Sequence, residues 1–250
     1  MKYIIPTSGL AMLLIIFLVS CEKRLKYDTF EPSKYLTLYE LHEAETFRSL
    51  DRALKKPDSV FKLVLFDQKL KEVPEEIHAL KYLNTLELTR NKLRSLPEYI
   101  GDMIYLQGLY LAENEFSKVP EQVYRLPRLK RFRAGENQLT GIPLRLLEMP
   151  TIEELYLGRN SITRVPDALY GMKQLRVLKL DHNQIDTLKP AIARLDNLEV
   201  IDIGFNGLTS IPYEIAALTN LRILDISGNS IPVQIADSLK KLMPHTKITY

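Results

Sequence analysis

The sequence predicts an α/β solenoid, a stack of short coils that each add one strand to a parallel sheet. Asparagine recurs every 23 residues, and the residues around it follow the pattern LxxLxLxxNxLxxLPxxIxxLxx. A fixed period of about 20 to 29 residues is typical of a stacked solenoid. The single cysteine excludes an internal disulfide, so packing must stabilise the stack. The recurring positions are Asn91, Asn114, Asn137, Asn160, Asn183, Asn206 and Asn229.

The first half of each unit predicts a strand. In the unit that begins at Leu83, Leu86 and Leu88 alternate with other residues and therefore point to one face. Parallel strands pair at about 4.8 Å, so eight units predict a sheet about 34 Å long. The same frame fits seven other starting positions: Val60, Leu106, Leu129, Ile152, Leu175, Leu198 and Leu221.

The second half of each unit predicts a helical turn. In the stretch LPEYIGDM, Pro97 has a fixed φ and no amide hydrogen, which suits the start of such a turn. Ile100 and Met103 then point inward at three-residue spacing. The chain must also turn after each strand, and the buried backbone groups of that turn need partners. An asparagine side chain offers both donors and an acceptor.

The ends of the stack need caps, because no unit buries its apolar face alone. Residues 35–59 predict an N-terminal helical cap, with a helix that ends before Pro57 and turns Phe47, Leu50 and Leu54 inward. Residues 232–250 predict a C-terminal cap, with a final edge strand over residues 246–250. Its helix should carry a row of apolar residues: Val233, Ile235, Ala236, Leu239 and Leu242.

The unit closely resembles the leucine-rich repeat family, specifically the 23-residue type with LPxxI in its second half and its bacterial members. The resemblance covers residues 60–231. It implies a right-handed, horseshoe-like solenoid of about eight repeats, with a parallel concave sheet and terminal caps. It also implies that the recurring asparagines point inward and bond neighbouring loops, so they form a structural ladder rather than a binding site.

The first 21 residues predict a signal peptide. Lys2 precedes an apolar run over residues 10–19, which is shorter than the ~20 residues that a membrane-spanning helix needs. The stretch LVSC ending at Cys21 resembles the bacterial lipoprotein lipobox. That resemblance implies cleavage after residue 20, a diacylglyceryl group on the thiol and acylation, for example with palmitate, of the new amino terminus. An unmodified cysteine is the alternative.

The segment after the cysteine predicts where the protein is held. Residues 21–34 are polar and indicate a tether between the lipid and the folded body. Several acyl chains give stable anchoring, whereas one chain gives only marginal membrane binding. Glu22, in place of the aspartate that signals retention at the inner membrane, favours the outer membrane if the host has two. We therefore expect a membrane-anchored lipoprotein of the cell envelope.

The sequence contains no catalytic or metal-binding motif. The four histidines are scattered, and there is no HExxH, P-loop or dinucleotide fingerprint. Asp181 and His182 are adjacent, but consecutive residues of a strand point to opposite faces. The net charge of +3 does not indicate a nucleic-acid partner. We expect a protein that is not an enzyme and holds no cofactor or metal.

The concave face carries the candidate binding residues. Tyr110, Arg133, Tyr156 and Lys179 should stand on neighbouring strands, over about 14 Å, and Arg131 adds a second cation. Tyrosine and arginine are frequent at binding hot spots. Small residues beside them, Ala112, Gly135 and Gly158, should leave room for a ligand. The alternative is an ordinary solvated strand face on which Arg133 stacks against the two tyrosines.

Three functions fit this pattern. The first is a lipid-anchored interaction module that binds another protein through its concave face. The second is an envelope receptor for a carbohydrate or small ligand, because tyrosine faces beside glycines also suit sugars. The third is a structural envelope protein without one defined partner. Fold analogy supplies much of the support for each, and a fold alone does not establish a function.

Overall fold

The computed structural model describes residues 31–250. The predicted signal peptide, Cys21 and most of the predicted tether lie outside these residues. A short 3-10 turn, η1, spans Pro32–Lys34. The larger compact unit of the chain is Leu36–Tyr250, and the account below concerns that unit.

A single parallel sheet of ten strands runs through the unit, and its strands follow one another in chain order. This confirms the predicted α/β solenoid. Eight strands belong to the predicted repeats, and one further strand is added at each end. The strands are β1 (Thr46–Phe47), β2 (Lys62–Val64), β3 (Thr85–Glu87), β4 (Gly108–Tyr110), β5 (Arg131–Arg133), β6 (Glu154–Tyr156), β7 (Val177–Lys179), β8 (Val200–Asp202), β9 (Ile223–Asp225) and β10 (Lys247–Thr249).

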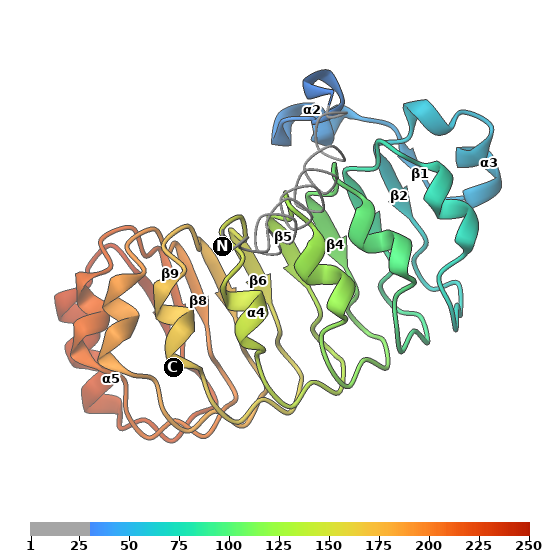
Figure 1. The fold of residues 1–250 in the computed structure, drawn as a ribbon. Coiled ribbons are helices and arrows are strands. Elements are labelled where there is room, and N and C mark those ends of the chain that lie inside the picture. The colour runs from blue at the N-terminus through green and yellow to red at the C-terminus, as the bar shows by residue number, and fades with distance from the viewer. Residues whose placement is uncertain (1–30) are drawn as a thin grey trace, which may run out of the picture. The chain divides into compact units, whose positions relative to one another are not determined.

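Helical turns cover the other face of the stack (Figure 1). Most are 3-10 turns of five residues, and in all but one of these the residue before the turn is proline, whose fixed φ suits that position. Leu144–Leu147 forms an α-helical turn instead, α4. The 3-10 turns are η3 (Glu75–Ala79), η4 (Glu98–Asp102), η5 (Glu121–Arg125), η6 (Asp167–Gly171), η7 (Pro190–Arg194) and η8 (Tyr213–Ala217).

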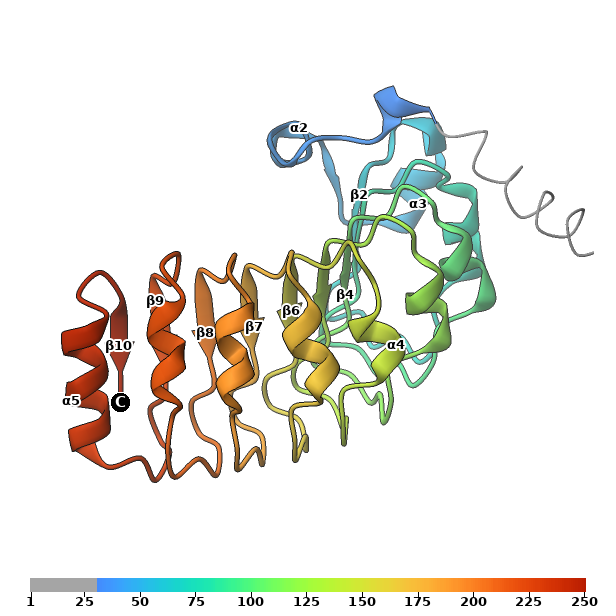
Figure 2. The same ribbon diagram turned by 60° about the vertical axis from the view of Figure 1, so that its left-hand side comes forward.

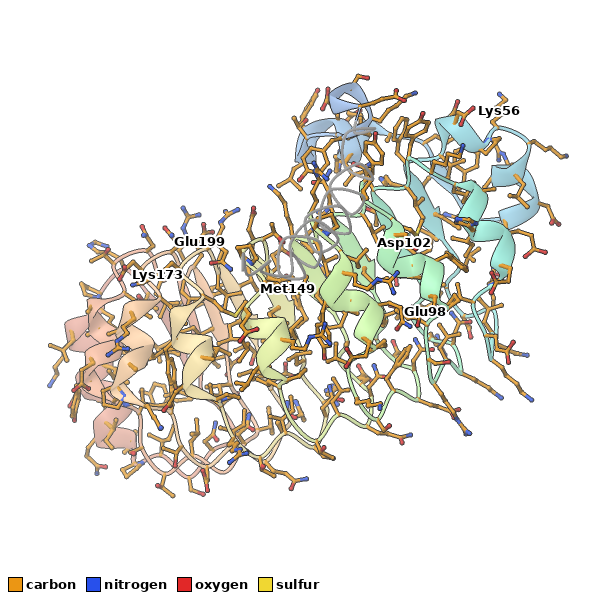
Figure 3. All side chains as sticks on the ribbon, viewed as in Figure 1. Lys56, Glu98, Asp102, Met149, Lys173 and Glu199 are labelled. Carbon is orange, nitrogen blue, oxygen red and sulfur yellow. The ribbon has the colours of Figure 1, made fainter. Side chains whose placement is uncertain are left out.

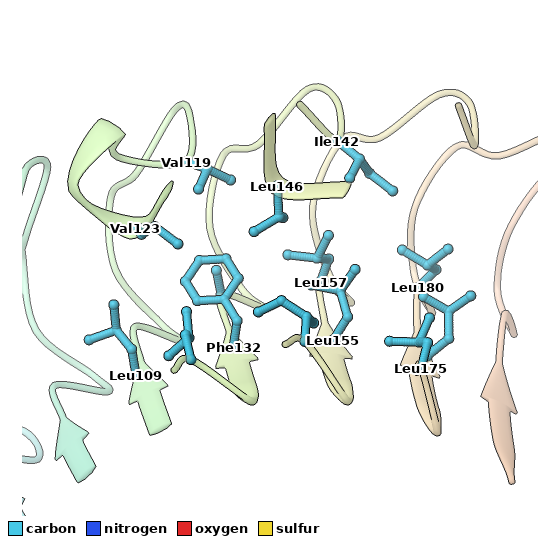
Figure 4. Packing of buried hydrophobic residues seen from close by; sticks show 14 of the residues in the cluster. Leu109, Val119, Val123, Phe132, Ile142, Leu146, Leu155, Leu157, Leu175 and Leu180 are labelled. Atoms are coloured by element: carbon cyan, nitrogen blue, oxygen red, sulfur yellow. The ribbon is translucent and has the colours of Figure 1, made fainter. Parts of the chain in front are cut away.

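The core is one continuous layer between the strands and the helical turns (Figure 4). Leu109, Phe132 and Leu155 are fully buried at the same position of three successive strands. Val123 and Leu146, from the turns, are equally buried and face them. Each coil therefore buries its apolar side chains against the next coil as well as within itself, as expected for a solenoid.

The recurring asparagines connect each coil to the one before it. In all seven, Nδ2 donates to a carbonyl 26 residues earlier at 2.9–3.1 Å. Oδ1 accepts from an amide 21 residues earlier at 2.9–3.0 Å. Asn91, Asn114 and Asn183 are buried, and the other four are half-buried. Their side chains thus satisfy backbone groups that the turns leave without partners.

The residue before each asparagine has a positive φ, which the sequence pattern did not predict. Glu113 has φ 51° and Phe205 has φ 52°, values in the left-handed region that favours glycine. Only the last of these positions is a glycine, Gly228 with φ 66°. The turn that directs the asparagine inward therefore imposes this conformation on residues other than glycine at every coil except the last.

The N-terminal cap differs from the predicted single helix. Helix α3 spans Leu50–Leu54, capped by the Ser49 side chain, and a 3-10 turn, η2, spans Pro57–Ser59. Phe47 is buried but lies in β1, where it pairs with Leu63 of β2, rather than in the helix. The extra strand forms because the first repeat would otherwise leave its strand edge unpaired.

The C-terminal cap consists of helix α5, Val233–Leu242, and strand β10, which pairs with β9. Ala236 and Leu239 are buried, but Val233 and Leu242 are exposed at the two ends of the helix. Only the middle of the helix therefore packs against the last coil. No helix in residues 31–250 is long and apolar enough to cross a membrane.

An N-terminal arm, residues 36–43, falls within the predicted cap, but its separate helix was not predicted. It contains helix α2, Leu38–Glu43, which Thr37 and Glu40 close with a capping box. Buried carboxamides hold its start: the Leu36 amide donates to Asn84 Oδ1 at 3.0 Å, and Gln107 Nε2 donates to the Leu36 carbonyl at 2.6 Å. In Figures 1 and 2 the arm lies on the strand side of the first repeats.

Exposed ion pairs join neighbouring coils across the outside of the stack. Arg125 contacts Glu98 Oε2 at 2.5 Å and Asp102 Oδ1 at 2.9 Å, and both acids lie on the preceding turn, as Figure 3 shows. Lys173 likewise reaches Asp196 at 3.2 Å. Exposed pairs of this kind contribute at most about 1 kcal/mol each, so they accompany the core rather than replace it.

Candidate functional site

The sheet register brings four of the predicted binding residues side by side. Tyr110, Arg133, Tyr156 and Lys179 are direct neighbours on β4, β5, β6 and β7. They face away from the core, because the residue before each of them in its strand is the buried one. All four are half-buried. We call these four residues the concave stripe.

Arg133 is sandwiched between the two tyrosines of the concave stripe. Its Cζ lies 4.8 Å from the centre of the Tyr110 ring and 4.3 Å from that of the Tyr156 ring. Lys179 Nζ lies 6.0 Å from the Tyr156 ring. Contacts of this kind are attractive cation–π interactions. The stripe is thus a stacked and ordered surface before anything binds to it.

Two carboxylates adjoin the concave stripe. Glu154 Oε2 lies 3.7 Å from Arg133 Nη2 and accepts a hydrogen bond of 3.3 Å from the Tyr156 hydroxyl. Asp202 Oδ2 lies 3.6 Å from Lys179 Nζ. Two of the stripe's cations therefore have acidic partners within the sheet, at distances typical of loose ion pairs rather than of short bonds.

Arg131 stands beside the concave stripe without a carboxylate. No acidic oxygen of residues 31–250 lies within ion-pairing distance of its guanidinium. Its register neighbour Glu154 is directed to Arg133 and Tyr156 instead. Three buried side-chain atoms also lack a hydrogen-bond partner among the described residues, and all belong to β3 and β5: Thr85 Oγ1, Arg131 Nε and Arg133 Nε.

The phenols of the stripe stay protonated at neutral pH. Burial raises the pKa of Tyr110, and the charges of Arg131 and Arg133 only partly oppose this shift. Burial also raises the pKa of Tyr156, with Glu154 adding to the effect. Both hydroxyls can therefore donate hydrogen bonds to a bound partner.

The glycines beside the stripe do not leave the open space predicted from the sequence. The Asp181 carboxylate occupies the space above Gly158, and a Cβ on Gly135 would lie 3.0 Å from the Gly158 carbonyl oxygen. Adjacent coils approach closely here, so small residues are required by packing. The expectation of a ligand-sized gap at these glycines was wrong.

Asp181 and His182 contact each other, contrary to the expectation from strand alternation. His182 Nδ1 lies 3.1 Å from Asp181 Oδ2. Strand β7 ends at Lys179, and His182 has a φ of 51°, so alternation no longer applies. The imidazole stacks on Phe205 with a centroid distance of 4.3 Å. Within residues 31–250 there is no group of three side chains that could hold a metal ion.

Comparison with protein families matches two parts of the chain. A model described as "Leucine-rich repeat region" matches residues 76–184. A second, described as "Leucine Rich repeats (2 copies)", matches residues 196–241. No curated protein matches the sequence.

Comparison with solved structures gives bacterial and plant neighbours. A leucine-rich repeat protein of Leptospira interrogans is 32% identical, with a TM-score of 0.65 over 75% of this chain and 54% of that one. An internalin of Listeria monocytogenes, inlF, is 21% identical, with a TM-score of 0.66 over 82% and 58%. The plant peptide hormone receptor RGFR1, in complex with RGF2, is 26% identical, with a TM-score of 0.56 over 70% and 33%.

The chain thus spans little more than half the length of the two bacterial proteins. It shares their repeats rather than their full architecture. The internalin likeness concerns the fold alone, because the sequence identity is low. The repeated motif, the two family matches and the ten-stranded parallel sheet together show that this chain carries leucine-rich repeats folded as a leucine-rich repeat solenoid.

Proposed function

We propose that the protein is a non-enzymatic interaction module that binds another protein through its concave face. The observation that carries this proposal is the concave stripe, in which Arg133 is stacked between Tyr110 and Tyr156. Stacking fixes these side chains before binding, so less conformational entropy is lost on association. Tyrosine and arginine at the centre of a surface are also the residue types that carry most interface energy.

The same stacking disfavours the carbohydrate alternative. A sugar ring binds by lying against a free aromatic face, but the guanidinium of Arg133 covers one face of each tyrosine. The space above Gly158 is filled by Asp181. A protein partner can instead form ion pairs and hydrogen bonds with the charged side chains of the face and with the tyrosine hydroxyls. Specific retention on a glycan array would favour the carbohydrate function over the one proposed.

We further propose that lipid on Cys21 anchors the protein to the cell envelope, in the outer membrane if the host has two membranes. This rests on the lipobox-like residues 18–21 and the apolar run before them. Labelling of cells with radioactive palmitate should mark the wild-type chain and not a Cys21→Ser variant. An unlabelled wild-type chain in the soluble fraction would contradict the anchor and leave the concave site untouched.

Photocrosslinking tests the concave site directly. A photoreactive phenylalanine analogue replaces Tyr156 in one strain and Tyr213 in another. Tyr213 is an exposed tyrosine on η8, on the opposite face, and serves as the matched control. Illumination of intact cells should give a crosslinked protein at position 156 that is absent at 213. Equal crosslinking at both positions, or none at 156, would remove the support for the concave face.

A further inference from the structure

The N-terminal arm closes one end of the concave face. Thr85 and Gly108, two positions before Glu87 and Tyr110 in their strands, are buried, with Thr85 only 7% exposed. On the coil before them, Lys62 Nζ donates to the arm's His42 carbonyl at 3.5 Å. The equivalent residues from β5 to β9 are half-buried or exposed. Arg131 is the first side chain of this row beyond the covered end.

The arm and Arg131 are linked through one buried residue, Gln107. Gln107 is 2% exposed, and its Nε2 donates to the arm's Leu36 carbonyl at 2.6 Å. Its own backbone carbonyl accepts from the Arg131 amide at 2.9 Å. The start of the arm and the backbone of Arg131 are thus held by the same residue. We expect little relative movement between them.

Arg131 differs from the other cations on these strands. Four basic residues stand on β2 to β9. Lys62 donates to the His42 carbonyl, Arg133 pairs with Glu154, and Lys179 pairs with Asp202. Arg131 has no acidic partner within residues 31–250; its Nε is buried without a hydrogen bond, as is that of Arg133. The terminal guanidinium nitrogens of Arg131 can therefore donate to a bound anion without first giving up a carboxylate of the protein.

The unpaired guanidinium indicates what kind of anion fits. Arg133 pairs with Glu154 and Lys179 with Asp202, whereas no carboxylate of residues 31–250 pairs with Arg131. A guanidinium fork matches a carboxylate in a two-pronged geometry. A carboxylate carries one negative charge and is the anionic group of an unmodified protein.

We propose that Arg131, which lies beside the point where Gln107 holds the arm, binds a carboxylate from an acidic segment of the protein partner. This inference rests on the proposed function of the concave face. The arm limits the segment at one end, and the concave stripe runs past Arg131 from β4 to β7. The Tyr110 hydroxyl lies above Gly108, on the coil between Thr85 and Arg131, as a neighbouring donor.

A displayed library of random peptides, selected on the immobilised full chain, tests the inference. Wild type should enrich peptides rich in Asp and Glu, and Arg131→Gln should lose that preference. Lys247→Gln is the matched control, because Lys247 occupies the same row on β10 at the far end of the sheet. An enriched acidic peptide should bind Arg131→Gln about 10- to 100-fold more weakly, the range for a lost charge-assisted hydrogen bond. Lys247→Gln should bind it as wild type does.

The outcomes separate the inference from the proposed function. If acidic peptides bind Arg131→Gln as well as wild type, Arg131 is not the anchor. If wild type enriches only uncharged peptides, and Tyr156→Ala loses them, the concave site stands and the carboxylate inference is overturned. If no peptide is enriched, or Tyr156→Ala binds all of them unchanged, both proposals fail. Circular dichroism of each variant confirms that the fold is retained.

Discussion

Replacement of Asn114 by alanine tests the asparagine ladder most sharply. Asn114 Oδ1 accepts from the Leu93 amide at 2.9 Å, and Nδ2 donates to the carbonyls of Leu88, Leu111 and Ala112 at 2.9–3.1 Å. The residue is buried, at 8% exposure. Simple counting of lost bonds would predict that four backbone groups are left without partners.

The structure predicts a smaller loss, because the carbonyls have second donors. Leu88 also accepts from the Asn91 side chain, Leu111 from Asn137, and Ala112 from the Arg90 amide. Only the Leu93 amide loses its sole partner among the described residues. One buried, unsatisfied donor costs about 1 to 3 kcal/mol. We expect Asn114→Ala to lower the free energy of unfolding by that amount.

Asn91 provides the contrast, because it is the first rung of the ladder. Among residues 31–250 it alone donates to the Leu65 carbonyl, and its Oδ1 accepts from the amides of Gln68 and Leu70 at 3.1 and 3.0 Å. The first repeat has Gln68 in the asparagine slot, and that residue supplies no replacement bond to Leu65. Three groups lose their partners, so Asn91→Ala should cost at least about 1 kcal/mol more than Asn114→Ala.

Urea unfolding followed by circular dichroism measures both variants. The comparison is valid where the slope of the transition is unchanged, because a repeat protein can lose cooperativity. Asn114→Asp is a further control, since it keeps the acceptor for Leu93 but points a carboxylate at three carbonyls. A loss in the free energy of unfolding for Asn114→Ala that equals or exceeds the loss for Asn91→Ala is the opposite result. It would contradict the argument that the second donors to the carbonyls of Leu88, Leu111 and Ala112 limit the loss.

Three further predictions follow from the same structure. Gly228→Ala should lower the free energy of unfolding by about 1 to 3 kcal/mol, because Gly228 has a φ of 66° and a Cβ there would lie 2.5 Å from the Phe205 ring. Gly171→Ala is the control: there is open space for its Cβ, so it should have little effect in the same urea assay. Burial raises the pKa of the Asp202 carboxyl, so its favourable contribution is present below the unfolded pKa of about 3.9 and is lost as pH rises through the folded pKa. Asp202→Asn should therefore raise the melting temperature at pH 7, and this increase should disappear below about pH 4. Thermal melts at a series of pH values measure it, and an increase that stays constant with pH would contradict the argument. Gln107→Ala should release the N-terminal arm, measured as faster hydrogen exchange over residues 36–44, and unchanged exchange there would show that the arm is held by other contacts.

The repeat pattern determined the fold at the level of single coils. A contact that recurs every 23 residues needs the same side chain at the same position of every coil, so the sequence records it repeatedly. The buried leucines of the strands, the helical turns after proline and the positions of the asparagines could all be predicted in this way. So could the alignment of Tyr110, Arg133, Tyr156 and Lys179, because in-register parallel strands keep residues 23 apart side by side.

Contacts that occur once could not be predicted from the period. The arm is held by Asn84 and Gln107, which lie 48 and 71 residues from Leu36, and no repeated signal marks that meeting. The contact between Asp181 and His182 depends on a positive φ that the turn imposes. Both follow from how particular side chains pack at one place in the stack.

The sequence by itself determined a ladder of identical coils and the order of side chains along its inner face. Only the tertiary structure decided which of those side chains are already partnered. Glu154 bonds to Arg133 and Tyr156, and Arg131, beside the arm, has no acidic partner in the described part of the chain. The physical reason is that strand register fixes the position of each Cα atom and therefore which residues are neighbours. Competition among neighbouring charges, together with burial, decides which of those neighbours a side chain contacts.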